Sequence, residues 1–480
     1  MKVDLLKYVR KILKYSIILF VLQNVFQSSG IGIKIKYPLV LLWMLVVSIV
    51  LLMIKVQMES GGGIKHCVLY INQFVKKIDL VVLIFCLVYL IDLIVLPILH
   101  HIPLSNSIDD AGMMMMIFLY FPFSILVRMK EINLLDYKNI FINSVVVLGM
   151  WFSIMWIFEN VQPGFYTAFL NFLYELKCFN IQPVLEGYGM IRIVQSNMLL
   201  LGVGILLFTI VPFSKGMKWE AYRIFSLFIL IFGMCTTYLK SLWLGVIASL
   251  CLIIFILLIQ YIFFHRKKGI AFVCKNFIIC FVSVLLINQI FDGGIFGRFE
   301  NMFFLSDKDN QTEIEKNVID SDTEIKIDNN SNNNYNKEQD AEGTVVSNEL
   351  RVEQITKLTN RWKEKPIFGF GYGGFVEGYT RTTIPNDYQF EVTSFALLMK
   401  TGIIGIIAWA MLIFFYLFMC IKKYSKNFVT LSLLLSIFVC IFLSVQTNPY
   451  LFCINTMSIL LYLLLFCFTS FNYKGENIND

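Results

Sequence analysis

The sequence is poor in charged residues. Asp, Glu, Lys and Arg make up 15% of the chain, whereas soluble domains contain about a quarter. The charges cluster between long apolar runs such as 39–54 and 244–264, and about 17–25 apolar residues are enough to cross a bilayer as a helix. The runs are apolar on every side, which excludes the alternating strands of a membrane barrel. The composition therefore predicts an all-α, polytopic membrane protein.

Signals for metal, nucleotide and nucleic acid are also missing. The 11 cysteines form no CxxC pair and lie mostly inside apolar runs, and the four histidines are loop residues without metal-ligand spacing. No P-loop, no Ser-His-Asp set and no nucleic-acid module is present. The net charge of +7 fits cytoplasmic loops rich in Lys and Arg. We expect no metal, no cofactor and no nucleic-acid partner.

The apolar runs predict about twelve spans. They cover residues 16–33, 37–54, 78–97, 111–127, 139–158, 193–213, 223–239, 242–264, 270–290, 394–420, 428–445 and 451–471. With the N-terminus inside, the inner segments hold 23 Lys and Arg and the short outer loops hold 5. Because positive charge marks the cytoplasmic side, both termini are predicted to be cytoplasmic, in a bacterial cytoplasmic (inner) membrane.

Three regions follow from this topology: nine spans in 1–290, one large extracytoplasmic loop at 291–390, and three spans with a tail in 391–480. Within the loop, residues 305–348 are acidic, rich in Asn and almost free of aromatic residues. Such a segment buries too little apolar area to offset its chain entropy, so we expect disorder. Residues 349–390 contain a tryptophan and a Gly-rich run and should be ordered.

Residues 347–364 have the pattern of an amphipathic helix lying against the outer surface of the membrane. At 100° per residue one face carries Arg351, Ile355, Leu358 and Trp362, with Val352 beside it, and the opposite face carries Glu353, Lys357, Asn360 and Glu364. An arginine on an apolar stripe either snorkels to the interface or binds an anionic group, since its guanidinium matches phosphate oxygens. The spacing leaves both readings open.

A Gly-rich loop at 365–375 follows this helix. Pro366 ends the helix, and Gly369 and Gly371 allow tight turns. No apolar strand precedes the loop and no Lys-Ser/Thr pair follows it, which argues against nucleotide binding. We interpret it as a close-packed surface loop.

Glu391 stands at the outer mouth of the next membrane helix, where it is either a solvated carboxylate or a general base. Gly402 and Gly405 lie on one side of that helix, where a neighbouring helix could pack closely. Lys240 lies where two apolar runs meet, and Arg192 precedes the sixth span. Each of these two cations is either a feature of a turn or part of a basic pocket at the outer face.

These elements, in this order, resemble the O-antigen ligase and O-antigen polymerase family. Lys240 stands where the family has the arginine of a Ser-Arg pair, Arg351 matches its second arginine, and Glu391 falls where ligases carry His. The other matching positions are Trp362, Pro366, Gly369 and Gly371 of a Trp…Pro-x-x-Gly-x-Gly element and Gly402 and Gly405 of a Gly-x-x-Gly element. Lys in place of Arg loses bidentate contacts, and Glu in place of His favours polymerase over ligase.

The resemblance implies a glycosyltransferase that polymerises undecaprenyl-pyrophosphate-linked oligosaccharide on the outer face of the membrane. It implies Arg351 and Glu391 as catalytic residues, and it implies that the substrate is bound by Lys240, Arg192, Trp362, Tyr372 and Tyr379. Its partners would be the lipid-linked donor, a glycan acceptor, membrane lipid, and a chain-length regulator or flippase. The alternatives are a ligase that transfers the glycan to a lipid or protein, a polysaccharide-lipid transporter or flippase, and an assembly scaffold.

Overall fold

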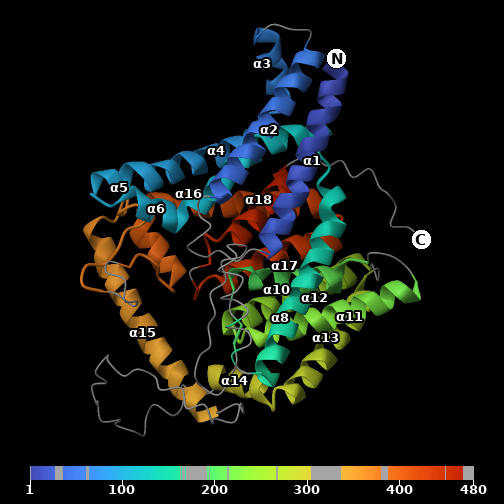
Figure 1. Ribbon diagram of the computed structural model, residues 1–480, viewed down its shortest axis with the longest axis vertical. Helices are drawn as coiled ribbons and strands as arrows, with labels where there is room; N and C mark the ends of the chain where they lie inside the picture. Colours follow the sequence, from blue (N-terminus) through green and yellow to red (C-terminus); the bar gives the residue numbers. More distant parts are fainter. Residues whose placement is uncertain are drawn as a thin grey trace.

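The computed structural model describes residues 2–26, 36–60, 64–162, 164, 168, 192–193, 195–212, 216–265, 269–303, 337–379, 387–448 and 450–468. These residues form helices and no strand, as the composition predicts. Figure 1 shows a bundle in which α1, α2 and α3 extend beyond the other helices at the end where the N-terminus lies.

The helices follow one another in a simple order. Those of the first half are α1 (Lys2–Phe26), α2 (Lys36–Glu59), α3 (Ile64–Asn72), α4 (Lys77–Leu90), η2 (Ile91–Val95), α5 (Leu96–Leu99), α6 (Leu104–Ala111), η3 (Gly112–Leu119), α7 (Tyr120–Arg128), η4 (Leu134–Tyr137) and α8 (Lys138–Val161). Those of the second half are η5 (Ser196–Met198), α10 (Leu199–Ile210), α11 (Met217–Thr236), α12 (Lys240–Phe264), α13 (Ile270–Ile290), α14 (Gly294–Phe303), α15 (Lys337–Glu364), α16 (Thr393–Tyr424), α17 (Phe428–Ser444) and α18 (Ile454–Phe468).

Eight helical stretches in the described part of the chain are long and apolar enough to cross a membrane. They are Leu39–Glu59, Lys77–Leu99, Leu104–Arg128, Leu134–Val161, Met217–Thr236, Lys240–Phe263, Ile270–Ile290 and Thr393–Tyr424. Each coincides with an expected span. Three other expected spans correspond to the shorter apolar helices α10, α17 and α18. The expected first span overlaps α1, whose first half is basic, and the count of twelve stays a prediction.

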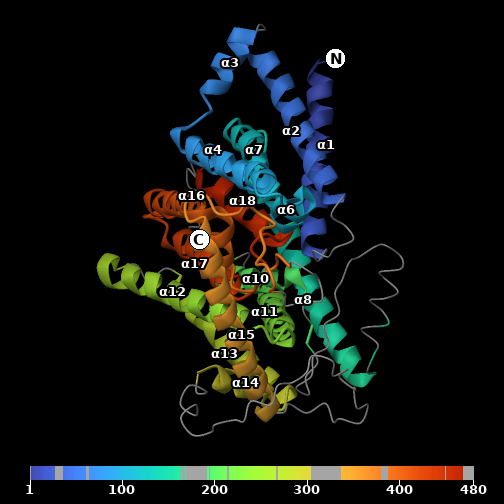
Figure 2. The same cartoon turned by 90° about the vertical axis from the view of Figure 1, so that its left-hand side faces the viewer.

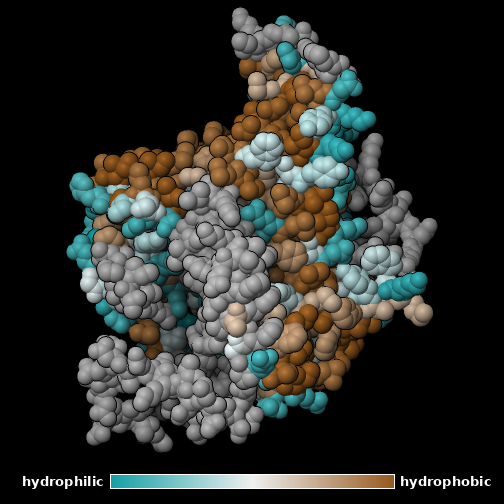
Figure 3. All heavy atoms as spheres, viewed as in Figure 1, coloured by the Kyte–Doolittle hydropathy of each residue, from teal (hydrophilic) through white to brown (hydrophobic). Residues whose placement is uncertain are grey.

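The outward faces of these helices are apolar. Figure 3 shows broad patches of hydrophobic side chains over the bundle. Many of these side chains are more than half exposed, among them Met53, Phe255, Ile278 and Phe414. Soluble proteins rarely expose apolar patches of this extent, whereas a bilayer solvates them. The protein is therefore a multi-pass membrane protein.

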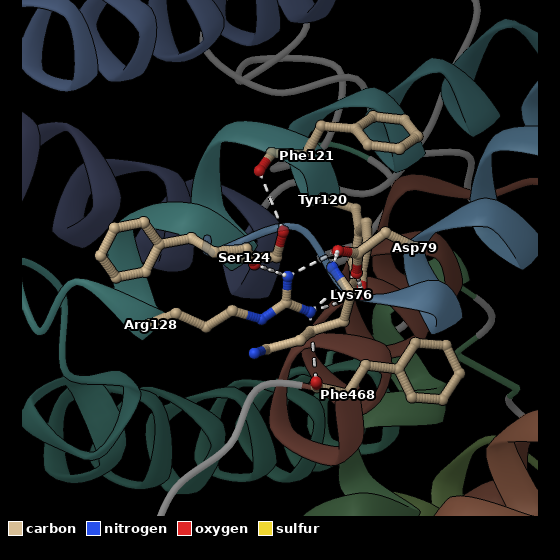
Figure 4. A network of polar contacts seen from close by, with 8 residues as sticks. Lys76, Asp79, Tyr120, Phe121, Ser124, Arg128 and Phe468 are labelled. Atoms are coloured by element: carbon tan, nitrogen blue, oxygen red, sulfur yellow. Dashed lines mark hydrogen bonds and ion pairs between the residues drawn. The ribbon is translucent and has the colours of Figure 1, made fainter. Parts of the chain in front are cut away.

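A buried ion pair joins three helix ends on the side away from the Gly-rich loop. Arg128, at the end of α7, donates to both carboxylate oxygens of Asp79 near the start of α4, at 2.6 and 2.7 Å. The Tyr120 hydroxyl donates to the same carboxylate at 2.6 Å, and Arg128 also donates to the Phe468 carbonyl of α18 at 3.2 Å (Figure 4). Both charges are satisfied, which a buried pair requires in order to be tolerated.

The predicted amphipathic helix is α15, and it is longer than expected. It begins at Lys337, so residues 337–348 are helical although the composition predicts disorder for them. Low apolar content limits burial but not helix formation, and the first half of this stretch, residues 337–342, consists mostly of Lys, Glu, Gln and Ala, which favour helix. The remainder of the predicted disordered segment lies outside the described residues. Figures 1 and 2 show α15 running from α16 to α14 along one side of the bundle.

Candidate active site

The Gly-rich loop fills a break in α16. At Gly402 the backbone leaves the helical region, with φ 60° and ψ −166°. The loop binds the backbone on both sides of this break through four hydrogen bonds: Gly371 N to Lys400 O (2.7 Å), Ile403 N to Pro366 O (3.0 Å), Ile404 N to Ile367 O (3.1 Å) and Phe370 N to Met399 O (3.2 Å). The Trp…Pro-x-x-Gly-x-Gly and Gly-x-x-Gly elements are therefore one interlocked unit.

Close backbone contacts explain why glycine occupies these positions. A Cβ atom on Gly402 would lie 2.4 Å from the Ile367 carbonyl oxygen, and one on Gly369 would lie 2.4 Å from the Lys400 carbonyl oxygen. Gly402 and Gly405 were predicted to lie on one side of the helix, where a neighbouring helix could pack closely, but Gly402 interrupts the helix. Gly405 does approach a neighbouring helix, since its Cβ position lies 3.2 Å from the Asp92 carboxylate.

The two predicted catalytic residues face each other at the N-terminal end of α16. Arg351 Nε lies 3.4 Å from Glu391 Oε2, and the two side chains are 31% and 27% exposed. Charge-assisted hydrogen bonds are shorter, about 2.7–2.9 Å, and half-exposed pairs contribute only about 0–1 kcal/mol. The pair is thus assembled but loosely held.

Gln354 links the helix that carries Arg351 to the residue that follows Glu391. It lies one turn after Arg351 on α15 and is 1% exposed. Its side-chain Oε1 accepts a hydrogen bond from the Val392 backbone N–H at 2.9 Å, directly after Glu391. Gln354 was not among the predicted site residues, although a glutamine beside the apolar stripe of this helix could have indicated a buried polar contact.

A small hydrophobic cluster anchors α15 over the Gly-rich loop. Its buried members are Ile102, Leu358, Phe370, Tyr379, Phe390, Ala396 and Met399. Trp362 packs against this cluster, and its indole N–H donates to the Pro366 carbonyl at 3.1 Å. The predicted apolar face of the helix is therefore the face that holds it on the protein.

The three aromatic residues predicted to stack on sugars differ in access. Trp362 is half-buried at the edge of the cluster, and Tyr379 is 8% exposed with the Lys357 ammonium over its ring at 4.4 Å. Tyr372 is 1% exposed and packs against Tyr89 and Phe452. A ring enclosed in the helix core cannot stack on a sugar, so Tyr372 does not fit the predicted role.

A second buried ion pair supports the Gly-rich loop. The sequence patterns did not predict it. Lys400 Nζ lies 2.6 Å from the Asp110 carboxylate and donates to the Tyr388 carbonyl at 2.8 Å. The same carboxylate accepts the Gly373 N–H at 2.8 Å. Burial, together with the carboxylates of Asp109 and Asp110, raises the pKa of Tyr388 above its usual value, so its hydroxyl stays protonated and donates to Asp109.

The two predicted cations of the outer face meet at the turn between α11 and α12. Ile193 N donates to the Thr236 carbonyl at 3.1 Å, and the Arg192 guanidinium contacts the Thr237 carbonyl at 3.5 Å. Lys240 begins α12 three residues later. The guanidinium of Arg298, which the sequence analysis did not single out, lies 5.5 Å from the Tyr238 ring in the same turn and is 7% exposed. This side of the site is basic.

The segment after α17 connects the basic turn to the Arg351–Glu391 pair. Asn448 Nδ2 donates to Ser241 Oγ at 2.9 Å, next to Lys240. Thr393 Oγ1, two residues after Glu391, donates to the carbonyls of Val445 at 2.6 Å and of Asn448 at 3.0 Å. The starts of α12 and α16 are thereby fixed to one short segment. Among the residues that the structure describes, no group of three His, Cys, Asp or Glu side chains has the arrangement of a metal site.

Comparison with known families identifies this arrangement. A family model described as O-antigen ligase matches residues 225–410. Residues 225–410 are thus similar to the O-antigen ligase family. The matched segment contains Lys240, Arg351, the Gly-rich loop, Glu391 and the break in α16, so this part of the predicted resemblance is confirmed. No curated protein matches the sequence. The O-antigen ligase domain implies an enzyme that transfers lipid-linked glycan to an acceptor at a membrane.

Proposed function

We propose that the protein polymerises oligosaccharide repeat units carried on undecaprenyl pyrophosphate, at the outer face of the bacterial cytoplasmic membrane. The observation that carries the proposal is the approach of Arg351 to Glu391, 3.4 Å apart on two separate elements of the O-antigen ligase domain. A cation and a carboxylate are the two groups that transfer from a pyrophosphate donor requires.

Glu391 is the proposed general base. A hydroxyl of the acceptor sugar attacks the anomeric carbon of the donor and loses its proton to the Glu391 carboxylate. The bond from the anomeric carbon to the phosphate oxygen breaks, and its electron pair leaves with the lipid pyrophosphate. A positioned base of this kind contributes roughly 10²- to 10⁴-fold.

Arg351 is proposed to hold the pyrophosphate as negative charge develops on it. Because its pair with Glu391 is long and partly exposed, an incoming dianion can replace the carboxylate at little cost. After that exchange the Arg351 guanidinium would bind the phosphate, and the Glu391 carboxylate would face the acceptor hydroxyl. Lys240 and Arg192, from the α11–α12 turn, are proposed to add positive charge on the donor side.

Trp362 and Tyr379 remain the proposed sugar-contacting residues. Trp362 packs against the hydrophobic cluster that holds α15 over the Gly-rich loop, and Tyr379 is a member of that cluster with 8% of its surface exposed. A chain-length regulator or flippase is a proposed further partner.

A ligase is the second candidate, because the matching family is described as O-antigen ligase. It would use the same donor chemistry and differ in the acceptor. The presence of Glu391 where ligases of this family carry His favours the polymerase. The two candidates predict different products when the protein is absent.

The test is deletion of the gene, followed by complementation and electrophoresis of the surface polysaccharide. Loss of a ladder, with single repeat units remaining, supports the polymerase, and full-length polymer stranded on carrier lipid indicates the ligase. R351A and E391Q should fail to complement, whereas K363A and E353Q, on exposed positions of α15, should complement fully. Unchanged polysaccharide after deletion would contradict both and favour a transporter.

A further inference from the structure

Gln354 is a buried amide at the centre of the candidate active site. It is 1% exposed and lies on the face of α15 that carries Arg351 and Leu358. A backbone N–H can only donate, so the side-chain atom that accepts from Val392 N at 2.9 Å must be the amide oxygen. This contact fixes the orientation of the whole amide group.

The amide nitrogen then faces away from Val392 with two hydrogens to donate. None of the residues that the structure describes accepts a hydrogen bond from Gln354 Nε2. Buried side-chain donors are almost always bonded in folded proteins, and an exception is accounted for by a ligand, an ion, an ordered water or a catalytic role. The exception here occurs within one helical turn of Arg351.

The neighbouring groups define what this donor would meet. Arg351 Nε also lacks a partner with hydrogen-bond geometry, and its guanidinium lies 3.4 Å from the Glu391 carboxylate. Two kinds of donor, one helical turn apart on α15, and one acceptor thus lie where α15 meets the start of α16. This combination suits a ligand rich in oxygen atoms, such as a glycan pyrophosphate.

We propose that Gln354 binds substrate: its Nε2 donates to a substrate oxygen that lies between Arg351 and Glu391, while its Oε1 positions Glu391 through Val392. This role rests on the proposed function, because it concerns the oxygen atoms of the same glycan transfer. The Gln354 amide would thus be a neutral donor whose orientation is fixed by its bond to the backbone. It lies beside Arg351 and Glu391, the charged groups that are proposed to exchange partners.

The test compares Q354E, Q354M and the exposed control E353Q in the full-length protein in lipid nanodiscs. The substrate is lipid-linked glycan extracted from the deletion strain. Q354E keeps an oxygen for Val392 and removes the donor, so we expect kcat/KM to fall roughly 10- to 100-fold with unchanged thermal stability. Q354M should show reduced but measurable activity at every pH, and E353Q should match wild type.

The pH profile separates substrate binding from a structural role. A protonated carboxyl has one donor and one acceptor and so mimics the amide. The activity of Q354E relative to wild type should therefore rise as pH is lowered from 8 to 5.5, whereas Q354M shows no such recovery.

Inhibition by inorganic pyrophosphate identifies which substrate oxygen Gln354 binds. Weaker inhibition of Q354M than of wild type indicates a phosphate oxygen, and equal inhibition indicates the sugar hydroxyl.

Two results would overturn the proposed role of Gln354, and a third would overturn the proposed function. If the wild-type protein is active and Q354E is equally active at pH 8, Gln354 does not bind substrate, and the proposed function is unaffected. Wild-type protein that leaves the extracted glycan unchanged would refute the proposed function itself. Equal loss of thermal stability in Q354E and Q354M, with no pH recovery, would reduce Gln354 to a structural contact.

Discussion

Replacing Gly402 by alanine tests whether the Gly-rich loop and the break in α16 form one locked unit. The residue has φ 60° and ψ −166°, a region that is essentially restricted to glycine and costs other residues about 1–3 kcal/mol. The added Cβ would also lie 2.4 Å from the Ile367 carbonyl oxygen. That oxygen cannot withdraw freely, because it accepts the Ile404 N–H at 3.1 Å.

Relief of the clash therefore breaks loop-to-helix hydrogen bonds. Four such bonds join 366–371 to 399–404, and each contributes about 0.5–1.5 kcal/mol. Losing one or two of them, in addition to the backbone strain, gives an expected cost of about 3–5 kcal/mol. The loop would detach from α16 and the mouth of the helix would be displaced.

Gly378 is the matched control. It also has a positive φ, 68°, but nothing lies within 4 Å of its Cβ position, so G378A should cost only about 1 kcal/mol of backbone strain. The assay is thermal unfolding of the purified protein in nanodiscs at one fixed scan rate, since such unfolding is irreversible, together with the polysaccharide ladder. Equal melting temperatures for G402A and G378A would refute the locked unit.

Three further variants test contacts elsewhere in the site and its frame. R128M leaves the buried Asp79 carboxylate without its cation and should destabilise the protein by about 3–5 kcal/mol; a melting temperature equal to wild type would contradict this. K400M leaves the Asp110 carboxylate without its cation and should lower both stability and ladder length, and the exposed K363A serves as its reference. N448A removes the contact with Ser241 and should reduce activity about tenfold, a loss of about 1.4 kcal/mol, with little change in stability; full activity would show that the bridge is dispensable.

Helical periodicity predicted the part of the site that local sequence controls. It placed Arg351, Leu358 and Trp362 on one face of α15, and the structure holds that face against α16. The apolar run after Glu391 likewise predicted α16. These features follow from the 3.6-residue repeat, which depends only on neighbours along the chain.

The break at Gly402 had no comparable signal. Apart from Lys400 and Thr401, the residues on either side are mostly apolar and continue the helix, so the sequence predicts an uninterrupted span. The break is stable because a loop from more than 30 residues earlier supplies the missing hydrogen bonds, and such tertiary compensation is invisible to local patterns. Tyr372 was misjudged for the same reason, since its burial depends on helices far away in the chain.

The site combines a rigid frame with a loosely held centre. Close glycine contacts, the buried Lys400–Asp110 pair and the partly buried Asn448–Ser241 hydrogen bond fix the backbone around it. Only the pair of Arg351 and Glu391 is long and partly exposed. An enzyme with the proposed function must bind and release a pyrophosphate in every cycle, so the groups that touch substrate would change partners at low cost while the backbone that positions them stays fixed. This division explains why motif glycines far from the chemistry are as necessary as the two charged residues.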